Sequence, residues 1–123
     1  MSFALDRDFA RRFAEEWIAA WNARDLERVL RHYSDDLEMS SPFIRQIMGQ
    51  AAGRLVGKTA VAAYWRKALD LIPELRFELQ ETLLGPDSIV LCYRGIHSNA
   101  AEILHFNAEG LVHKAAAHYG EPC

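Results

Sequence analysis

Four aromatic side chains recur at every fourth position near the start of the chain: Phe9, Phe13, Trp17 and Trp21. Positions three or four apart lie on one face of an α-helix, because the helix turns once every 3.6 residues or so. Charged residues occupy the positions between them. The pattern predicts a long amphipathic helix, and a face this rich in aromatic rings must be buried against a large apolar surface.

The composition is that of a folded domain that can supply such a surface. The chain has 123 residues, of which 50% are hydrophobic and 11% aromatic. We therefore expect a single domain spanning residues 1–123 and exclude intrinsic disorder. The 14 Lys and Arg against 17 Asp and Glu give a net charge of −3. This mildly acidic balance provides no attraction to nucleic acid or to an anionic membrane, and we expect neither as a partner.

The beginning of the sequence carries charged residues, such as Asp6 and Arg7, before any apolar run as long as that of a signal peptide. No later stretch approaches the length of a membrane-spanning helix. We therefore expect a cytoplasmic protein.

The hydrophobic spacing divides the rest of the chain into helices and strands. Asp25 is a candidate N-cap for a short second helix. From Leu37 the period drops to two until Pro42 ends the strand, and a third helix closes at Pro73. Four strands of a meander are then expected at 75–84, 88–96, 100–107 and 111–119. This order predicts an α+β fold with helices packed on one face of a curved antiparallel sheet.

Several short motifs resemble those of one protein superfamily. They are WIAAWNARDL at residues 17–26, YSDD at 33–36, SP at 41–42, GKTAVAAYW at 57–65, FNAEGLV at 106–112 and AHY at 117–119. Their order and spacing resemble the nuclear transport factor 2-like superfamily, with the SnoaL-like polyketide cyclases and the ketosteroid isomerases as the most similar branches. The resemblance implies a cone-shaped antiparallel sheet wrapped around the long N-terminal helix. It also implies three helices on the concave side and an apolar pocket inside.

The same resemblance suggests positions for catalytic groups. In ketosteroid isomerases a carboxylate before a Pro-Phe pair moves the proton, while a tyrosine and a neutral buried aspartate stabilise the enolate oxygen. Here Ser41 stands at the position of the carboxylate and Trp17 at that of the tyrosine. Tyr33 is retained from the tyrosine network, Trp65 replaces another of its members, and Glu102 stands at the position of the buried acid. A serine hydroxyl without a partner is not a general base near neutral pH, so the base of the steroid isomerases is absent.

Glu102 lies in a run of apolar residues of the third meander strand, where burial would raise its pKa. If the preceding hairpin turn centres on Ser98, Arg94 lies directly opposite Glu102, and such a pair would lower the pKa instead. Two interpretations stay open. Glu102 is an acid or hydrogen-bond donor with Arg94 as its partner or as a substrate anchor, or the two residues form an ion pair that stabilises the strands.

His113 is the candidate base on the last strand, or else an ordinary hydrogen-bonded histidine of the sheet. Its face depends on the register of the last hairpin, and a bulge at Gly110 would exchange the two faces of that strand. If residue 106 pairs with residue 111, the pocket face carries Glu102, Leu104, His113, Ala115, Ala117 and Tyr119. In neither register do the histidines converge, so we expect no metal site and no cofactor.

The aromatic residues Trp17, Tyr33, Trp65 and Tyr119 either fill the core or line the pocket and bind a flat apolar ligand. Ser41 and Phe43 would contact that ligand from the end of the first strand. Residues 43–57 form a long connection with three glycines and several apolar side chains. Such a segment could cover the mouth of the pocket as a lid.

Both faces of the meander are apolar. Val90, Cys92, Leu104 and Phe106 are expected on one face, and Ile89, Leu91, Tyr93 and Ile103 on the other. Helices can cover only one of the two faces. We therefore expect a homodimer through the outer face of the sheet.

These features together predict a protein that binds a small apolar molecule in the cone. We expect a cofactor-free acid–base isomerase or lyase acting on an apolar carbonyl compound. Glu102 would be the acid or oxyanion donor, Arg94 and Tyr33 its polar support, and His113 a base. The alternative is a non-catalytic ligand-binding or dimerisation domain, which the missing carboxylate at Ser41 favours.

Overall fold

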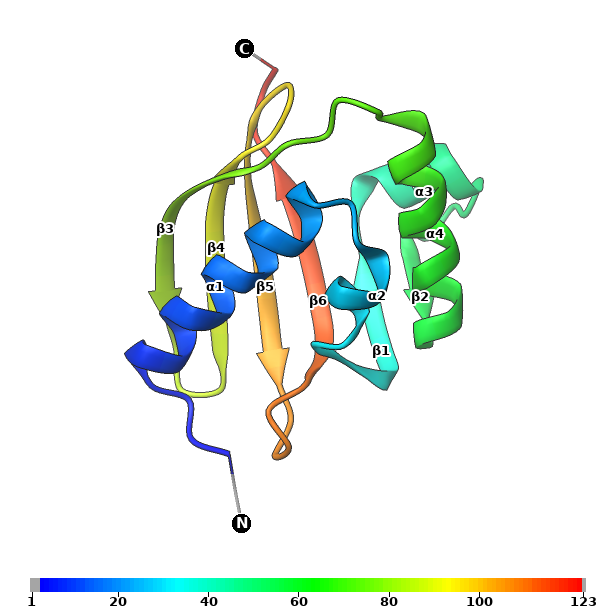
Figure 1. The fold of residues 1–123 in the computed structure, drawn as a ribbon. Coiled ribbons are helices and arrows are strands. Elements are labelled where there is room, and N and C mark those ends of the chain that lie inside the picture. Colours follow the sequence, from blue (N-terminus) through cyan, green and yellow to red (C-terminus); the bar gives the residue numbers. More distant parts are fainter. Residues whose placement is uncertain (1–2, 123) are drawn as a thin grey trace.

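The computed structural model describes residues 3–122 and contains helices, a sheet and short connections (Figure 1). The helices are α1 (Arg7–Asn22), α2 (Leu26–Leu30), α3 (Pro42–Met48) and α4 (Lys58–Leu71). The strands are β1 (Tyr33–Ser40), β2 (Arg54–Val56), β3 (Glu78–Leu84), β4 (Ser88–Arg94), β5 (Asn99–Phe106) and β6 (Val112–Tyr119). The long first helix and the four strands of the meander confirm the main elements that the sequence predicts.

Capping side chains fix where the first two helices begin. The Asp6 carboxylate accepts a hydrogen bond from the backbone N–H of Phe9 at 2.8 Å, which satisfies one of the free donors at the start of α1. The Asp25 carboxylate accepts a hydrogen bond from the backbone N–H of Arg28 at 3.2 Å and so caps α2, as the sequence predicts. Between these caps, Phe13, Trp17 and Trp21 are buried along one side of α1. The aromatic face of this helix is therefore the core of the protein.

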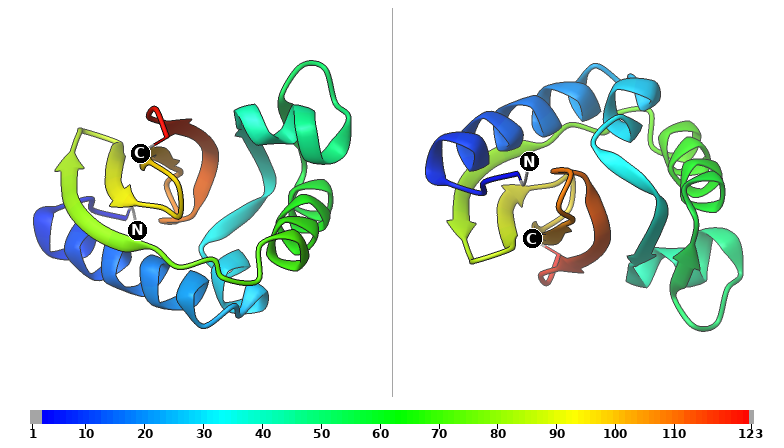
Figure 2. Two further views of the ribbon diagram at one scale, coloured as in Figure 1. Left: turned by 90° about the horizontal axis from the view of Figure 1, so that it is seen from above. Right: turned by 90° about the horizontal axis from the view of Figure 1, so that it is seen from below.

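The strands form one six-stranded sheet in the order β2-β1-β6-β5-β4-β3. All neighbouring strands are antiparallel except β1 and β6, which are parallel. Figure 2 shows from both ends how strongly the sheet curves, with α1 across one side and α4 beside β1. The α+β fold with a curved sheet is confirmed, and the sheet is mixed where the sequence predicted an antiparallel one.

The connection expected over 43–57 contains regular structure that the sequence analysis missed. Ser41 caps α3 by accepting from the N–H of Phe43 at 3.2 Å, and Pro42 occupies the first turn, where a missing N–H costs nothing. Gly49 ends the helix in the left-handed conformation with φ of 65°. Strand β2 then pairs antiparallel with Glu38–Ser40. The fold has four helices among the described residues, one more than expected.

The two faces of the meander differ from the expected assignment. Ile89 pairs with Leu104 and Leu91 with Glu102, and all four side chains are buried on the inner face with Tyr93. The outer face carries apolar side chains that are half-buried, or exposed in the case of Leu83. The strand pairs on this face are Leu83 with Val90, Val90 with Ile103, Cys92 with Ala101, and Ile103 with Ala116. The expectation that Leu104 and Phe106 share a face with Val90 and Cys92 is therefore wrong. The register of the hairpin differs from the expected one by three residues, since Arg94 pairs with Asn99 and not with Glu102, and a shift by an odd number of residues exchanges the two faces of a strand.

Within residues 3–122, no helix has both the length and the apolar composition needed to cross a bilayer.

Candidate functional site

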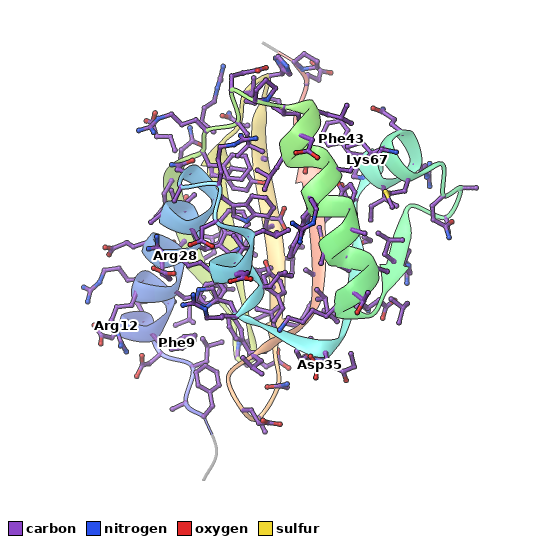
Figure 3. All side chains as sticks on the ribbon, turned by 45° about the vertical axis from the view of Figure 1, so that its right-hand side comes forward. Phe9, Arg12, Arg28, Asp35, Phe43 and Lys67 are labelled. Atoms are coloured by element: carbon purple, nitrogen blue, oxygen red, sulfur yellow. The ribbon has the colours of Figure 1, made fainter. Side chains whose placement is uncertain are left out.

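A pocket of about 140 Å³ lies between α1, α4 and the inner face of the sheet. Its aromatic lining is Trp17, Trp21, Phe43, Tyr64, Trp65, Phe77, Tyr93 and Tyr119. Its aliphatic lining is Met39, Ile47, Ala68, Ile72, Leu75 and Ile96, and Gly95, His97, Ser98 and Glu102 complete it. Figure 3 shows the side chains that fill the space between the helices and the sheet, with Phe43 labelled beside α4.

The walls are held by contacts between aromatic rings. The Trp17 indole stacks on Phe77 with ring centroids 5.7 Å apart and lies 5.3 Å from the ring of Tyr93. Trp21 meets Trp65 edge to face at 5.3 Å, which joins α1 to α4. Such contacts add to the burial of apolar area and fix the position of each ring. The pocket wall is consequently an extension of the aromatic core.

Glu102 is the buried acid of the pocket, with only 5% of its surface exposed. It projects from β5 on the inner face, where its strand neighbours are Leu91 and Ala117. Burial raises the pKa of its carboxyl to about 7, against a smaller lowering effect of the hydrogen bond from the Tyr93 hydroxyl at 3.2 Å. Near neutral pH the acid therefore exists in both its protonated and its ionised form.

Tyrosines and Ser41 form a polar group next to this acid. The Tyr64 hydroxyl donates to Ser41 Oγ at 3.2 Å, the same atom that caps α3. Burial raises the pKa of the Tyr119 hydroxyl and the nearby charge of Glu102 raises it further, while hydrogen bonds with Ser41 and Tyr93 lower it to a smaller extent. The hydroxyls thus link helix α4 to the strand that carries Glu102, and they stay protonated at neutral pH.

Tyr33 supports the pocket from behind its lining. Its side chain is almost completely buried, and its hydroxyl accepts a hydrogen bond from Trp17 Nε1 at 2.9 Å. Burial raises the pKa of this hydroxyl, and the nearby charge of Glu102 raises it further. Tyr33 therefore holds the Trp17 indole in place and remains neutral beside Glu102.

The structure brings five of the predicted site residues to the pocket lining: Glu102, Trp17, Phe43, Trp65 and Tyr119. Ser41 and Tyr33 are buried directly behind that lining through the hydrogen bonds described above. Leu104, Ala115 and Ala117 are buried on the inner face but do not line the pocket. The roles proposed for all of these residues stay predictions.

The expected pairing of Arg94 with Glu102 is wrong. Arg94 is the last residue of β4 and pairs with Asn99, so the hairpin loop is Gly95–Ser98 and its centre lies before Ser98. The partner of Glu102 is Leu91. Because the register differs by an odd number of residues, Arg94 belongs to the outer face and Glu102 to the inner one.

The expected place of His113 on the pocket face is also wrong. The register of β5 and β6 is interrupted between His105 and Phe106, which pair with Lys114 and Val112. His113 falls between these two partners as the extra residue of a bulge, and it is exposed to solvent. Beyond the bulge, Ala115 and Ala117 return to the inner face, as expected.

The sequence analysis missed the residues at the rim of the pocket. His97 and Ser98 come from the loop between β4 and β5, and Ile72 and Leu75 from the segment after α4. A loop lacks the periodicity that reveals a buried face, so its contribution to a site depends on how the neighbouring elements pack. The one available signal was the apolar content of 72–77 on either side of Pro73.

No group of three or more His, Cys, Asp or Glu side chains within residues 3–122 is arranged to hold a metal ion. Glu102 and His97 are the only such residues among those that line the pocket.

The SnoaL-like domain model matches residues 14–116 of this chain. A SnoaL-like protein of unknown function from Burkholderia thailandensis is 50% identical, with a TM-score of 0.91 over 96% of this chain and 99% of the other. No curated protein sequence matches this chain.

Two more distant structures share the fold. An NTF2-like protein of unknown function from Burkholderia pseudomallei is 18% identical, with a TM-score of 0.73 over 90% of each chain. SalBIII, an epoxide hydrolase/cyclase-like enzyme with a role in pyran ring formation in the polyether salinomycin, is 13% identical, with a TM-score of 0.72 over 94% of this chain and 93% of the other. At these identities the likeness concerns the fold alone.

Proposed function

Since the chain belongs to the SnoaL-like domain family, we propose that its pocket binds an apolar carbonyl compound and that Glu102 donates a hydrogen bond to the carbonyl oxygen. The observation that carries this proposal is the burial of Glu102 in an aromatic pocket whose lining, among residues 3–122, contains neither Lys nor Arg. Such a carboxyl group keeps a protonated fraction near neutral pH, and a protonated carboxyl is a strong hydrogen-bond donor.

The proposed reaction is a cofactor-free isomerisation of an unsaturated ketone. A base removes a proton from the carbon between the carbonyl group and the double bond; the electron pair of that C–H bond forms a new carbon–carbon double bond, and the π pair of the carbonyl group moves to its oxygen. Glu102 stabilises the resulting oxyanion by its hydrogen bond. The protonated base then returns the proton to the far carbon of the double bond, so that the double bond moves into conjugation and no atom is gained or lost.

We propose His97 for the base in place of His113. His97 lines the pocket from the loop between β4 and β5, whereas His113 lies on the bulge of β6 and does not line it; both side chains are exposed to solvent. An imidazole ring nitrogen can take up a proton and return it, which is the work of a general base. Ser41 is less suited to this role, since its Oγ already accepts hydrogen bonds from Phe43 and Tyr64.

The test is turnover of β,γ-unsaturated ketones and polyketide-like ketones, followed by the absorbance of the conjugated product and by exchange of the α-proton. We expect activity in the wild type and a loss of about a hundredfold or more in Glu102→Gln, which keeps the shape but donates a weaker hydrogen bond. Glu109→Gln, an exposed change in the loop after β5, is the matched control. No turnover of any ketone by the wild type would sink the enzymatic proposal.

The second candidate function is ligand binding without chemistry. The capping and hydrogen-bonding roles of Ser41 favour it, because the residue at the expected place of the base is occupied in holding α3 and Tyr64 together. In that case the pocket binds ketones without converting them, and Glu102→Gln changes affinity only.

A further inference from the structure

The size and charge of the pocket define the class of compound that it can hold. We propose that the ligand is a neutral carbonyl compound with a single ring, and that compounds with several fused rings are excluded. This inference rests on the proposed function for the carbonyl group, and its size limit stands on the geometry of the pocket alone.

The volume of the pocket is the first observation. At about 140 Å³, it is comparable to an engineered protein cavity of about 150 Å³ that binds benzene. Pockets for larger organic ligands typically measure about 300–1,000 Å³. A compound with one six-membered ring therefore fits the enclosed part, while a four-ring compound would have to push the walls apart.

The walls are the second observation, because they are tied together at several points. Asn22 Nδ2 donates to the carbonyl of Phe77 at 2.9 Å, and its Oδ1 accepts from the N–H of the same residue at 2.7 Å. This pair of bonds fixes the segment before β3 to the end of α1. The Arg24 guanidinium donates to the carbonyls of Leu69 and Ile72. These bonds fix the end of α4 to the turn between α1 and α2. Widening the pocket here would break these bonds.

Charge is the third observation. Among the described residues, none of those that line the pocket is Lys or Arg. A carboxylate or phosphate ligand would lie in an apolar space next to Glu102 without a permanent countercharge, and burying an unpaired charge is costly. A neutral carbonyl ligand avoids that cost and still accepts a hydrogen bond from the carboxyl group of Glu102.

The experiment compares ketones of one, two and four rings by the quenching of tryptophan fluorescence, which reports on three indoles in the wall. The probes are cyclohexenone, tetralone and androstenedione, with benzoate as the anionic probe of one ring. We expect cyclohexenone to bind at least about tenfold more tightly than androstenedione and than benzoate.

Two variants test whether the wall sets the limit. Ile72→Ala with Leu75→Ala removes two half-buried side chains from the wall, and we expect the affinity for tetralone to rise by about tenfold. Leu71→Ala, an exposed position at the end of α4, should leave all affinities unchanged. Ala68→Trp fills the pocket and should abolish binding of cyclohexenone, whereas Ala63→Trp on the exposed side of α4 should not.

The outcomes separate the size limit from the proposed chemistry. Equal affinities for one-ring and four-ring ketones would overturn the size limit, even if Glu102 proved to be catalytic. Binding of none of the ketones would overturn it as well. Selective binding of cyclohexenone without turnover would support the size limit and contradict only the proposed reaction.

Discussion

The pKa of Glu102 shows how the surroundings of one residue decide its chemistry. The sequence placed this residue among apolar neighbours, and that alone predicted a raised pKa. The competing prediction, a lowered pKa through Arg94, failed because a hairpin loop of four residues moved Arg94 to the other face. Local sequence determines how apolar a strand is, but loop lengths and bulges determine which residues meet across strands. His113 was misplaced for the same reason.

A change of pH should reveal the raised pKa of Glu102 as a change in stability. Between its ordinary value of 4.5 and about 7 in the folded protein, the folded state holds more protons than the unfolded one. The contribution of Glu102 to the free energy of unfolding should therefore be fully present below pH 4.5. It should fall by about 3 kcal/mol as the pH rises past 7. Tyr33, Tyr64, Tyr93 and Tyr119 face this group and remain neutral throughout.

Urea unfolding of the wild type and of Glu102→Gln at pH 5 and pH 8 measures this effect. The variant cannot ionise at this position, so it should lack most of the loss between the two pH values. His32, whose pKa is lowered mainly by burial, contributes a change of opposite sign, and it does so equally in both proteins. An identical pH dependence in the two proteins would show that Glu102 is ionised throughout.

Helix α3 is, with β2, one of two elements that the sequence analysis did not predict, and it forms one side of the pocket mouth. Its first turn places Phe43 against Tyr119 of β6, with ring centroids 4.5 Å apart and both side chains 37% exposed. Long elements such as α1 and the meander strands were predictable because their periodicity extends over many residues. A helix of seven residues offers less than two periods, so only the Ser-Pro pair at its start could have indicated it.

Removal of the Phe43 ring should speed the exchange of ligand through the mouth. In Phe43→Ala, we expect the association and dissociation rates of cyclohexenone to rise by a similar factor of about three or more, with little change in affinity. Stopped-flow fluorescence measures both rates. Gln46→Ala, an exposed change on the same helix, is the control. Unchanged rates in Phe43→Ala would mean that the ligand enters elsewhere, for instance between Leu75 and His97.

At the scale of the whole molecule, the outer face of the sheet carries the continuous set of apolar side chains Leu83, Val90, Cys92, Ala101, Ile103 and Ala116. Neighbouring strands bring them side by side. We propose that a second copy of the chain covers this face. The apolar surplus of the sequence predicted such a face, but its membership followed only from the observed registers.

A charge at the centre of this outer face should prevent association. Val90→Glu is expected to shift the protein from dimer to monomer, because a carboxylate would have to be buried between two sheets. Light scattering at about 10 μM gives the mass of both forms, a concentration at which a dimer with a dissociation constant near 1 μM or below is largely assembled. Ala19→Glu on the exposed side of α1 is the control. A monomeric wild type would contradict the proposal.

The parallel pairing of β1 with β6 has a consequence for how the sheet and the pocket come together during folding. Strand β6 is the last strand in the chain, yet it lies between β1 and β5 in the sheet. Without β6, the order of the strands divides into β2-β1 on one side and β5-β4-β3, which carries Glu102, on the other. The central strand joins residues far apart in sequence, which makes folding slower. The two walls of the pocket that carry Met39 on β1 and Glu102 on β5 therefore come together through the pairing of β6 with both strands.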